Sequence, residues 1–449
     1  MAPLRRVILI GYCALTLALP TTARAGNTDE VLLGNQAALL GGAVTALVNQ
    51  GSALWYNPAG LQHIDHNSID LSLSAYSLRL YRIPRALTTP SGASANGDAT
   101  EAIIVPAAAA YVRTTRSGLR FGFGVFTTSS ASYNQRPGLQ VTDQSSPNLE
   151  WDWLNELDVE VDIYQLIAGV AWAVNDRVYL GVTLNGSYVS TTQSGQVGGA
   201  LISDPTTNEA VLLATSSSRT AVTGLGVRVG AGVMWKPNAR TSVGASFQTA
   251  SYLFFENRST QSIESGGTTL SNELTLDIQN ESGSSFQFDQ FEPWRIRAGF
   301  AYDFGPALLS IDADIQVNQG PNKVIGNGRV GALVPLNDNI TFGAGLFTDL
   351  NPVGGPLTNF GDAAIDFYGF TTGIEFDKLG RFSPEPSRGV SFKTAIAFRY
   401  AFGTGDFAGA LVADDLANVN PQDPNLVQTE ITDITVHELS IYVGSGIRF

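Results

Sequence analysis

The sequence is short of cysteine, of long apolar runs and of positive charge, and each shortage limits what the protein can be. Its single cysteine, Cys13, lies among the first 25 residues, so the chain beyond them has no thiol and no disulfide. After residue 25 no stretch reaches the roughly 18 apolar residues of a membrane-spanning helix. Against 40 Asp and Glu there are only 26 Lys and Arg, and this acidic balance argues against nucleic acid as a partner.

The N-terminus has the pattern of a secretory signal peptide. Two early arginines precede an apolar stretch over about residues 7–19, and the small residues at 23–25 fit a cleavage site. The apolar stretch is too short to cross a bilayer, which takes roughly 20 residues. We therefore expect residues 1–25 to be removed and the mature chain to begin at Gly26.

Long period-two alternation dominates the rest of the chain. In residues 177–188, apolar side chains from Val178 to Tyr188 share one face and polar or small ones share the other, and residues 389–402 repeat the pattern. Runs of about ten residues or more are long for a soluble sheet, and they suit tilted strands that cross a membrane.

About fourteen such strands can be placed, and the lengths of their connections alternate. Connections after even-numbered strands are mostly short, and those after odd-numbered strands are mostly long. A soluble β-sandwich also alternates but has no reason to separate its loops by length. The sequence therefore predicts an all-β membrane protein, an antiparallel outer-membrane β-barrel over residues 67–449, with long external loops. The predicted strands are 68–80, 102–113, 119–129, 160–174, 177–190, 221–235, 240–254, 292–304, 308–318, 326–335, 340–349, 365–376, 389–402 and 435–449.

Residues 26–66 precede the first strand and are small, apolar and compatible with helix. A segment of this length cannot fold alone, so we expect it to fill the barrel lumen as a plug, called the hatch below. Its end reads WYNPAG, in which Asn57 and Pro58 indicate a turn. We expect Asn57 to bond backbone groups there, while Ala59 and Gly60 let the backbone pass close to the wall.

The stretch LGNQAALLGGAVTALVNQGSALWYNPAGL resembles the N-terminal hatch of the FadL/TodX family of outer-membrane transport proteins, which ends in Asn-Pro-Ala. Asn57, Pro58 and Ala59 match that motif. The resemblance continues through IIVPAAAAYV and the last strand. It implies a monomeric fourteen-stranded barrel without a cofactor that takes up hydrophobic small molecules, with long-chain fatty acids and aromatic hydrocarbons as the family's substrate classes.

The resemblance also implies a kink in the third strand that opens the wall for lateral release into the membrane. In this strand, LRFGFGVF, the candidates are Gly122 and Gly124, because glycine favours bends and bulges within strands. Pro106 on the second strand cannot donate to the ladder and would loosen pairing there. The alternative is that these glycines only make room inside the lumen.

Ligand capture would fall to external loops at 191–220 and 255–291. Four inward arginines could meet a carboxylate head group, or could instead pair with Asp312 and Asp314. The candidate ligand-binding residues are Val211, Leu212, Leu213, Leu253, Phe254, Phe255, Arg228, Arg295, Arg297 and Arg399.

The chain ends in LSIYVGSGIRF, and its terminal Phe449 looks like the signal by which the barrel-assembly machinery recognises outer-membrane barrels. The expected surroundings are therefore the lipid and lipopolysaccharide of a Gram-negative outer membrane. The acidic stretch 150–162 could hold calcium or bridge to lipopolysaccharide through divalent ions, or could simply be a solvated loop.

We expect no metal site and no enzyme. The residues His63, Asp65 and His66 offer few metal ligands in a short turn, and no Gly-x-Ser-x-Gly motif is present. The alternatives left open are a porin for polar solutes, against which the apolar hatch argues, and an outer-membrane lipid-cleaving enzyme.

Overall fold

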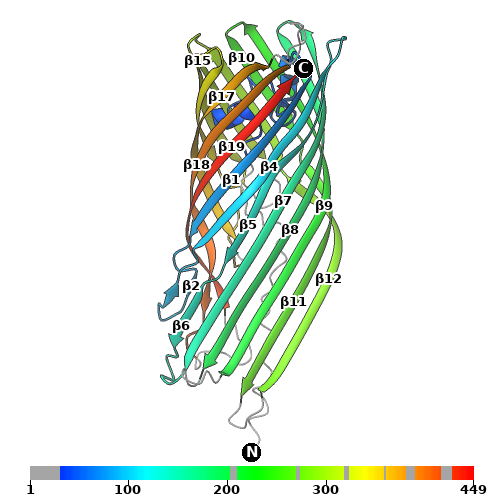
Figure 1. Cartoon of the computed structure of the whole chain (residues 1–449). Coiled ribbons are helices and arrows are strands. Elements are labelled where there is room, and N and C mark those ends of the chain that lie inside the picture. The colour runs from blue at the N-terminus through cyan, green and yellow to red at the C-terminus, as the bar shows by residue number, and fades with distance from the viewer. Residues whose placement is uncertain are drawn as a thin grey trace, which may run out of the picture.

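The computed structural model describes residues 31–202, 210–268, 274–317, 323–357, 360–380, 390–415 and 427–449. They form one closed antiparallel barrel of 14 wall strands, as predicted (Figure 1). The barrel closes where β1 (Ser68–Arg82) pairs along its length with β19 (Val427–Arg448). The predicted signal peptide, residues 1–25, lies outside the described residues.

Each predicted strand coincides with an observed wall strand, and two wall strands are interrupted. β10 and β11 together form one wall strand, and β12 and β13 form the next. The short strands β2 (Leu87–Thr88), β3 (Ser94–Ala95) and β6 (Gly138–Thr142) are additions to the wall. The remaining strands are β4 (Ala99–Thr114), β5 (Arg120–Gln135), β7 (Glu150–Asn175), β8 (Val178–Ile202), β9 (Ala210–Asn238), β10 (Thr241–Gln248), β11 (Ser251–Thr268), β12 (Leu274–Glu292), β13 (Trp294–Asp303), β14 (Leu308–Val317), β15 (Ile325–Asn337), β16 (Ile340–Asp349), β17 (Ala363–Gly380) and β18 (Val390–Val412).

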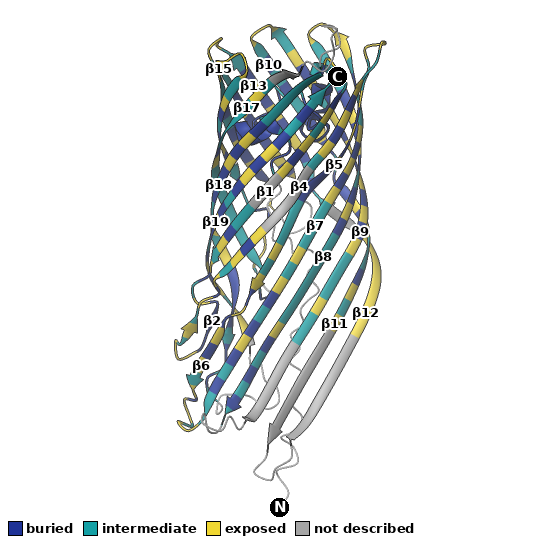
Figure 2. Ribbon diagram, viewed as in Figure 1, coloured by how far each residue is buried: buried dark blue, intermediate teal, exposed yellow. Residues whose placement is uncertain are grey.

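Side chains alternate between the lumen and the outer face of the wall. Along β13, Ile296 and Phe300 are exposed on the outside, whereas Arg295 and Arg297 are buried inside. The same alternation of exposed and buried residues runs along the other strands (Figure 2). On β9 the outward apolar run extends from Leu225 to Trp235, which at the usual rise and tilt covers about 25 Å, the height of an outer-membrane apolar band.

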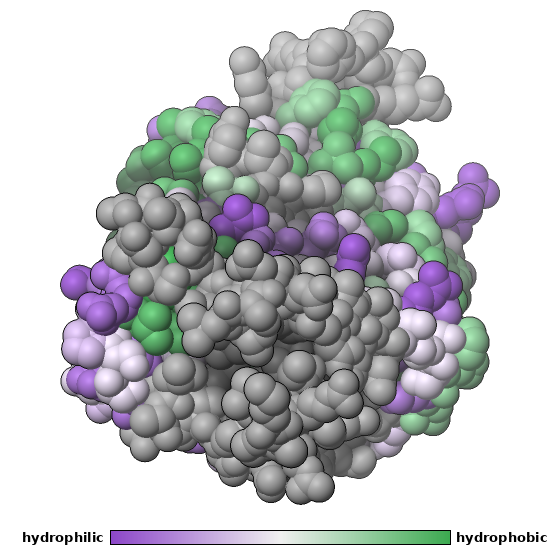
Figure 3. Space-filling view, turned by 90° about the horizontal axis from the view of Figure 1, so that it is seen from below, coloured by the Kyte–Doolittle hydropathy of each residue, from purple (hydrophilic) through white to green (hydrophobic). Residues whose placement is uncertain are grey.

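The predicted long loops are mostly strand, which corrects the sequence-based expectation. β7, β8, β9, β11 and β12 continue far past the apolar band, so most of 191–220 and 255–291 lies in paired strands, as does 150–162 (Figure 1). Segments 191–220 and 255–291 are rich in Ser, Thr and Gly, whereas 150–162 is acidic and buries Trp151 and Trp153 in an apolar cluster. Beyond the band no lipid enforces an outward row of apolar side chains, so the period-two signal is weaker there. Ladders with long neighbours hold these segments extended. Figure 3 views this end of the molecule and shows hydrophobic and hydrophilic residues mixed around its rim.

The described part of the hatch lies inside the barrel at the end that carries the short turns (Figure 1). It contains α1 (Asn35–Leu40), α2 (Ala53–Tyr56) and the 3₁₀ helix η2 (Pro58–His63). Most of its buried apolar side chains form one cluster with inward residues of the wall, including Val112, Phe126 and Ile167, while Ala38 and Leu39 pack in another. Among the described residues, no helix combines the length and the apolar character that a membrane span requires.

β7 and β8, which contain the predicted strands 160–174 and 177–190, form a hairpin with a short turn. β7 ends at Asn175 and β8 begins at Val178, and the Asn175 side-chain oxygen accepts from the backbone N–H groups of Arg177 and Val178, each at 2.9 Å. This short turn lies at the hatch end, which we assign to the periplasm.

Single cysteines introduced at the two ends should test this orientation, since the chain beyond residue 25 has none of its own. A membrane-impermeant maleimide should label Glu160→Cys, on the long-strand side, in intact cells. On the assignment above its turn faces the periplasm, so Asp176→Cys should react only after lysis. The opposite pattern of labelling would invert the barrel.

Candidate functional site

The hatch lies directly against the wall, and glycines in the wall make this approach possible. A Cβ added to Gly181 on β8 would overlap the backbone of Pro58, and one added to Gly232 on β9 would overlap the side chain of Asn57. The Asn-Pro turn therefore packs against two glycines of the wall, and any larger residue at either position would occupy the space that the turn needs.

Asn57 joins the hatch to this surface. It is fully buried, and its amide nitrogen donates to the carbonyl of Thr45 in the hatch at 2.8 Å and to that of Val233 on β9 at 3.1 Å. Its side-chain oxygen accepts from the N–H of Ala59 at 3.2 Å. One side chain thus satisfies two carbonyls and one N–H group in a buried place, where an unmet polar group costs about 1–3 kcal/mol.

Trp55 lies between two arginines of the wall. The Arg228 guanidinium carbon is 4.7 Å from the centroid of the indole ring, and that of Arg297 is 5.5 Å from it. Arg297 also donates to the carbonyl of Trp55 at 3.0 Å, and so does Gln248. Cation–π contacts of this kind gain strength where water is excluded.

The buried carboxylate of Asp314 is shared by three arginines near the hatch. It pairs with Arg295, with Arg297 at 3.6 Å and with Arg329 at 3.4 Å. Its neighbour Asp312 accepts from the backbone N–H of Thr45 at 2.7 Å. These carboxylates thus compensate the lumen arginines and also hold the hatch.

His63 at the end of the hatch packs edge-on against Tyr179, with ring centroids 4.8 Å apart. Burial, assisted by the nearby charge of Lys236, lowers the pKa of His63 to about 3, so the ring is neutral at pH 7. Within the described ranges no three His, Cys, Asp or Glu side chains are grouped so that they could hold a metal.

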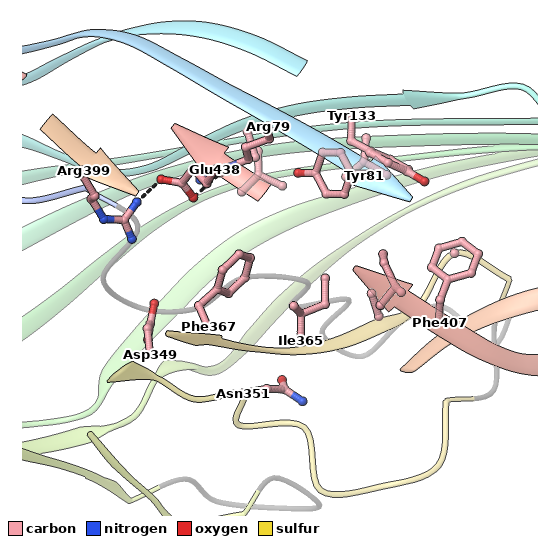
Figure 4. Close-up of a pocket in the computed structure, with 16 residues that line it drawn as sticks. Arg79, Tyr81, Tyr133, Asp349, Asn351, Ile365, Phe367, Arg399, Phe407 and Glu438 are labelled. Atoms are coloured by element: carbon pink, nitrogen blue, oxygen red, sulfur yellow. Dashed lines mark hydrogen bonds and ion pairs between the residues drawn. The ribbon is translucent and has the colours of Figure 1, made fainter. Parts of the chain in front are cut away.

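A cavity of about 100 Å³ lies in the lumen (Figure 4). It is mostly apolar, with a polar group of side chains at one end. Farther along the wall its apolar lining joins a second buried cluster that includes Trp151 and Trp153. The lining residues are Arg79, Tyr81, Ala131, Tyr133, Val159, Val161, Asp349, Asn351, Gly361, Ala363, Ile365, Phe367, Arg399, Phe407, Ile434 and Glu438.

Beside this cavity the wall loses part of its hydrogen-bond ladder. β4 and β5 pair only from Thr114 opposite Arg120 to Ala108 opposite Phe126. Beyond Phe126, β5 stays paired with β7 and β4 stays paired with β1, but the ladder between β4 and β5 does not continue. We call the interval between residues 99–107 and 127–135 the wall gap.

A β-bulge lies where the wall gap begins. Thr127 pairs with Tyr164 and Ser129 with Ile163, so Thr128 is an extra residue in β5. A bulge of this kind bends its strand and increases the local twist. On the other side of the gap, the register of β4 against β1 shifts next to Pro106.

The side chain of Glu101 on β4 reaches across the wall gap. Its carboxylate accepts from the backbone N–H of Ser132 on β5 and from the hydroxyl of Tyr81 at 2.9 Å, and it lies 3.6 Å from Arg79. A side chain therefore bridges β4 and β5 where a backbone ladder would otherwise join them.

Gly122 and Gly124 lie within the regular part of the β4–β5 ladder rather than at the irregularity. A Cβ on Gly122 would press on Leu54 of the hatch, and one on Gly124 would press on Phe126. The sequence left open whether Gly122 bends the strand or makes room inside the lumen. Its contact with Leu54 favours the second interpretation, because a side chain here would collide with the hatch.

The ligand-binding candidates are scattered. Leu253 is buried and Phe255 is half-buried, but Phe254 points outward with 59% of its surface exposed. Among the described candidates only Arg399 lines the cavity. The side chains of the remaining apolar candidates, Val211, Leu212 and Leu213, lie outside the described residues.

The candidate arginines pair with carboxylates of the protein, which is the second of the two alternatives raised by the sequence. Arg295 and Arg297 contact Asp314, as expected, while Arg228 lies 3.5 Å from Glu292 and Arg399 bonds Glu438. Sequence reasoning missed the aromatic cavity lining, for example Tyr81, because inward aromatics on strands far apart in the chain carry no common motif.

The barrel and the lumen hatch define the class: an outer-membrane β-barrel with an internal plug. A family model described as outer membrane protein transport protein (OMPP1/FadL/TodX) matches residues 15–285. The chain belongs to this FadL/TodX family of outer-membrane transport proteins. A search of curated proteins by sequence finds no match.

Solved structures share the fold. A Pseudomonas aeruginosa FadL homologue is similar with a TM-score of 0.61 at 14% identity, covering 94% of this chain and 100% of its own. The toluene transporter TodX of P. putida gives a TM-score of 0.58 at 14% identity, with 94% and 99% covered. The monoaromatic hydrocarbon channel CymD gives 0.52 at 12% identity, with 93% and 97% covered.

Asn57→Ala should loosen the hatch without preventing assembly of the barrel. It leaves the carbonyls of Thr45 and Val233 without this donor, at a cost of about 1–3 kcal/mol each if water does not replace it. We expect a lower temperature for the heat-modifiable shift on gels, together with reduced uptake of a hydrophobic solute.

The matched control is Asn185→Ala, since Asn185 is equally buried but its amide atoms make no hydrogen bond with the described residues. If both variants unfold at the temperature of the parent and take up the solute fully, Asn57 does not hold the hatch. Residues 57–60 would then be a turn with no further role.

Proposed function

We propose that the protein takes up hydrophobic small molecules, such as long-chain fatty acids or hydrocarbons, by passive passage through the barrel and lateral release into the membrane. The observation that carries this proposal is the position of the wall gap beside the apolar cavity: Ala131 and Tyr133 line the cavity from the same part of β5 that borders the gap. A ligand in the cavity is therefore next to a stretch of the wall in which the ladder between two neighbouring strands is missing.

The apolar outer face of β5 supports the direction of release. Phe121, Phe123 and Val125 point outward and are exposed, and all three lie in the part that pairs with β4. The wall gap begins where this run ends, so it would open beside the outer part of the bilayer. Burial of apolar area, about 25 cal/mol per Å², would draw the ligand into the cavity, and lipid at the exit would keep it from being trapped.

Capture would take place on the extended sheet of β7, β8, β9, β11 and β12 rather than in loops, because these strands continue beyond the apolar band. The hatch would close the periplasmic end, with Asn57, Pro58, Ala59 and Gly60 as the joint that holds it. The apolar cluster formed by hatch and wall disfavours a water-filled path, which argues against a porin for polar solutes.

We further propose that the protein is a transporter and not an enzyme, and that it acts as a monomer within the lipid and lipopolysaccharide of the outer membrane. Phe449, half exposed at the end of β19 with its N–H donating to the carbonyl of Asn67 at 3.0 Å, would be the residue recognised by the barrel-assembly machinery.

Deletion of Thr128 tests lateral release. It removes the extra residue of the bulge while every other residue of β5 keeps its partner on β7, so the strand should straighten and the wall gap should narrow. We expect a folded barrel whose uptake of toluene into cells falls at least several-fold.

Gly186→Val serves as the control, because a Cβ at Gly186 meets only an ordinary contact at 3.9 Å. Substitution of Gly122 or Gly124 with valine should also impair uptake, through Leu54 and Phe126. Normal uptake by a folded Thr128 deletion would remove the wall gap from the path.

A further inference from the structure

The polar end of the cavity has its positive charge already compensated. Arg79 lies 3.1 Å from Glu438 and 3.6 Å from Glu101, and Arg399 also bonds Glu438. Figure 4 shows Arg399 and Glu438 facing each other at this end. With Asp349, which also lines the cavity and is 2% exposed, two guanidinium groups stand among three carboxylates.

From this balance we infer that the cavity selects a small uncharged ring that carries a hydrogen-bond donor, such as a phenol, and rejects carboxylates. The inference rests on the proposed function and narrows its substrate class. A ligand carboxylate would have to displace Glu438 from its arginines or lie next to Glu438 and Asp349, and like charges close together in a poorly hydrated place repel strongly.

The walls of the cavity favour a ring. Tyr81 and Tyr133 make an edge contact with centroids 4.8 Å apart, and Phe367 and Phe407 line the opposite side (Figure 4). Aromatic side chains attract a further ring in offset or edge-on geometry. A cavity of about 150 Å³ binds benzene. The cavity found here, of about 100 Å³, is of the same order.

The polar end presents acceptors to such a ring. The carboxylates of Glu438 and Asp349 and the amide of Asn351 lie at the lining, and a ligand hydroxyl could donate to any of them. A hydrogen bond to a charged acceptor is stronger than one between neutral groups, so a phenol gains over the plain hydrocarbon of the same shape.

The inference can be tested by equilibrium dialysis of the purified full-length barrel at pH 7 with p-cresol, toluene and p-toluate. The three ligands share a ring and differ in charge and in whether they carry a hydrogen-bond donor. We expect p-cresol to bind roughly tenfold or more tightly than toluene, the factor that a charged hydrogen bond supplies, and p-toluate to bind most weakly.

Glu438→Gln should reverse the charge preference, because it leaves Arg399 and Arg79 without a shared carboxylate: p-toluate binding should rise and the preference for p-cresol should fall. Asp349→Asn provides a second variant with the same expected direction, should the first fail to show the heat-modifiable folded band. Glu256→Gln removes one negative charge from β11 at a residue that does not line the cavity, and should leave all three affinities unchanged.

If the parent binds p-toluate as well as p-cresol, or if neither variant shifts the ratio, the inference is wrong. Ala131→Trp distinguishes this outcome from failure of the proposed function, since it fills the cavity from β5. Loss of uptake with Ala131→Trp keeps the cavity on the path even where selectivity is overturned, whereas unchanged uptake would remove the cavity from the path and overturn both.

Discussion

A strand in a bilayer must find partners for its backbone N–H and C=O groups, because lipid offers none. The closed ladder from β1 around to β19 meets this demand, and the hatch and the cavity both lie inside the wall that it forms. At the wall gap this ladder is interrupted, and the chain compensates for the interruption chemically. Glu101 supplies a carboxylate to the N–H of Ser132 where β4 has moved away, so the ladder can end without leaving that group unmet.

The hatch depends on a second constraint, which is the cost of burying charge. Lumen arginines and carboxylates on the wall would be unstable in isolation, and each is paired either with another wall residue or with the hatch itself. Asp312 with Thr45 and Arg297 with Trp55 show the second case. The hatch is therefore part of the electrostatic balance of the barrel, and movement of this segment would expose unpaired charge as well as apolar surface.

The sequence predicted those parts of the fold in which one side of a strand meets lipid. There the period-two pattern is enforced, and all fourteen wall strands were placed from it. Beyond the band no lipid enforces an outward row of apolar side chains, so segments such as 191–202, in which only Val197 and Leu201 join a buried cluster, have too weak a pattern to distinguish strand from loop. The hatch could be predicted from its composition and its NPAG turn. The cavity could not, because Tyr81, Phe367 and Phe407 come together only through the curvature of the closed wall.

The same limit explains why inward arginines were easier to find than to interpret. Sequence alternation places Arg399 in the lumen, and a lumen cation next to an apolar path suggests a partner for a fatty-acid carboxylate. The partner that decides its role, Glu438, lies on the neighbouring strand, and Arg79 on the strand beyond shares it. Whether a buried cation is available to a ligand depends on the charges around it, and those are set by cross-strand register rather than by local sequence. Here the register surrounds both arginines with carboxylates, so the polar end of the cavity offers hydrogen-bond acceptors rather than a site for an anion.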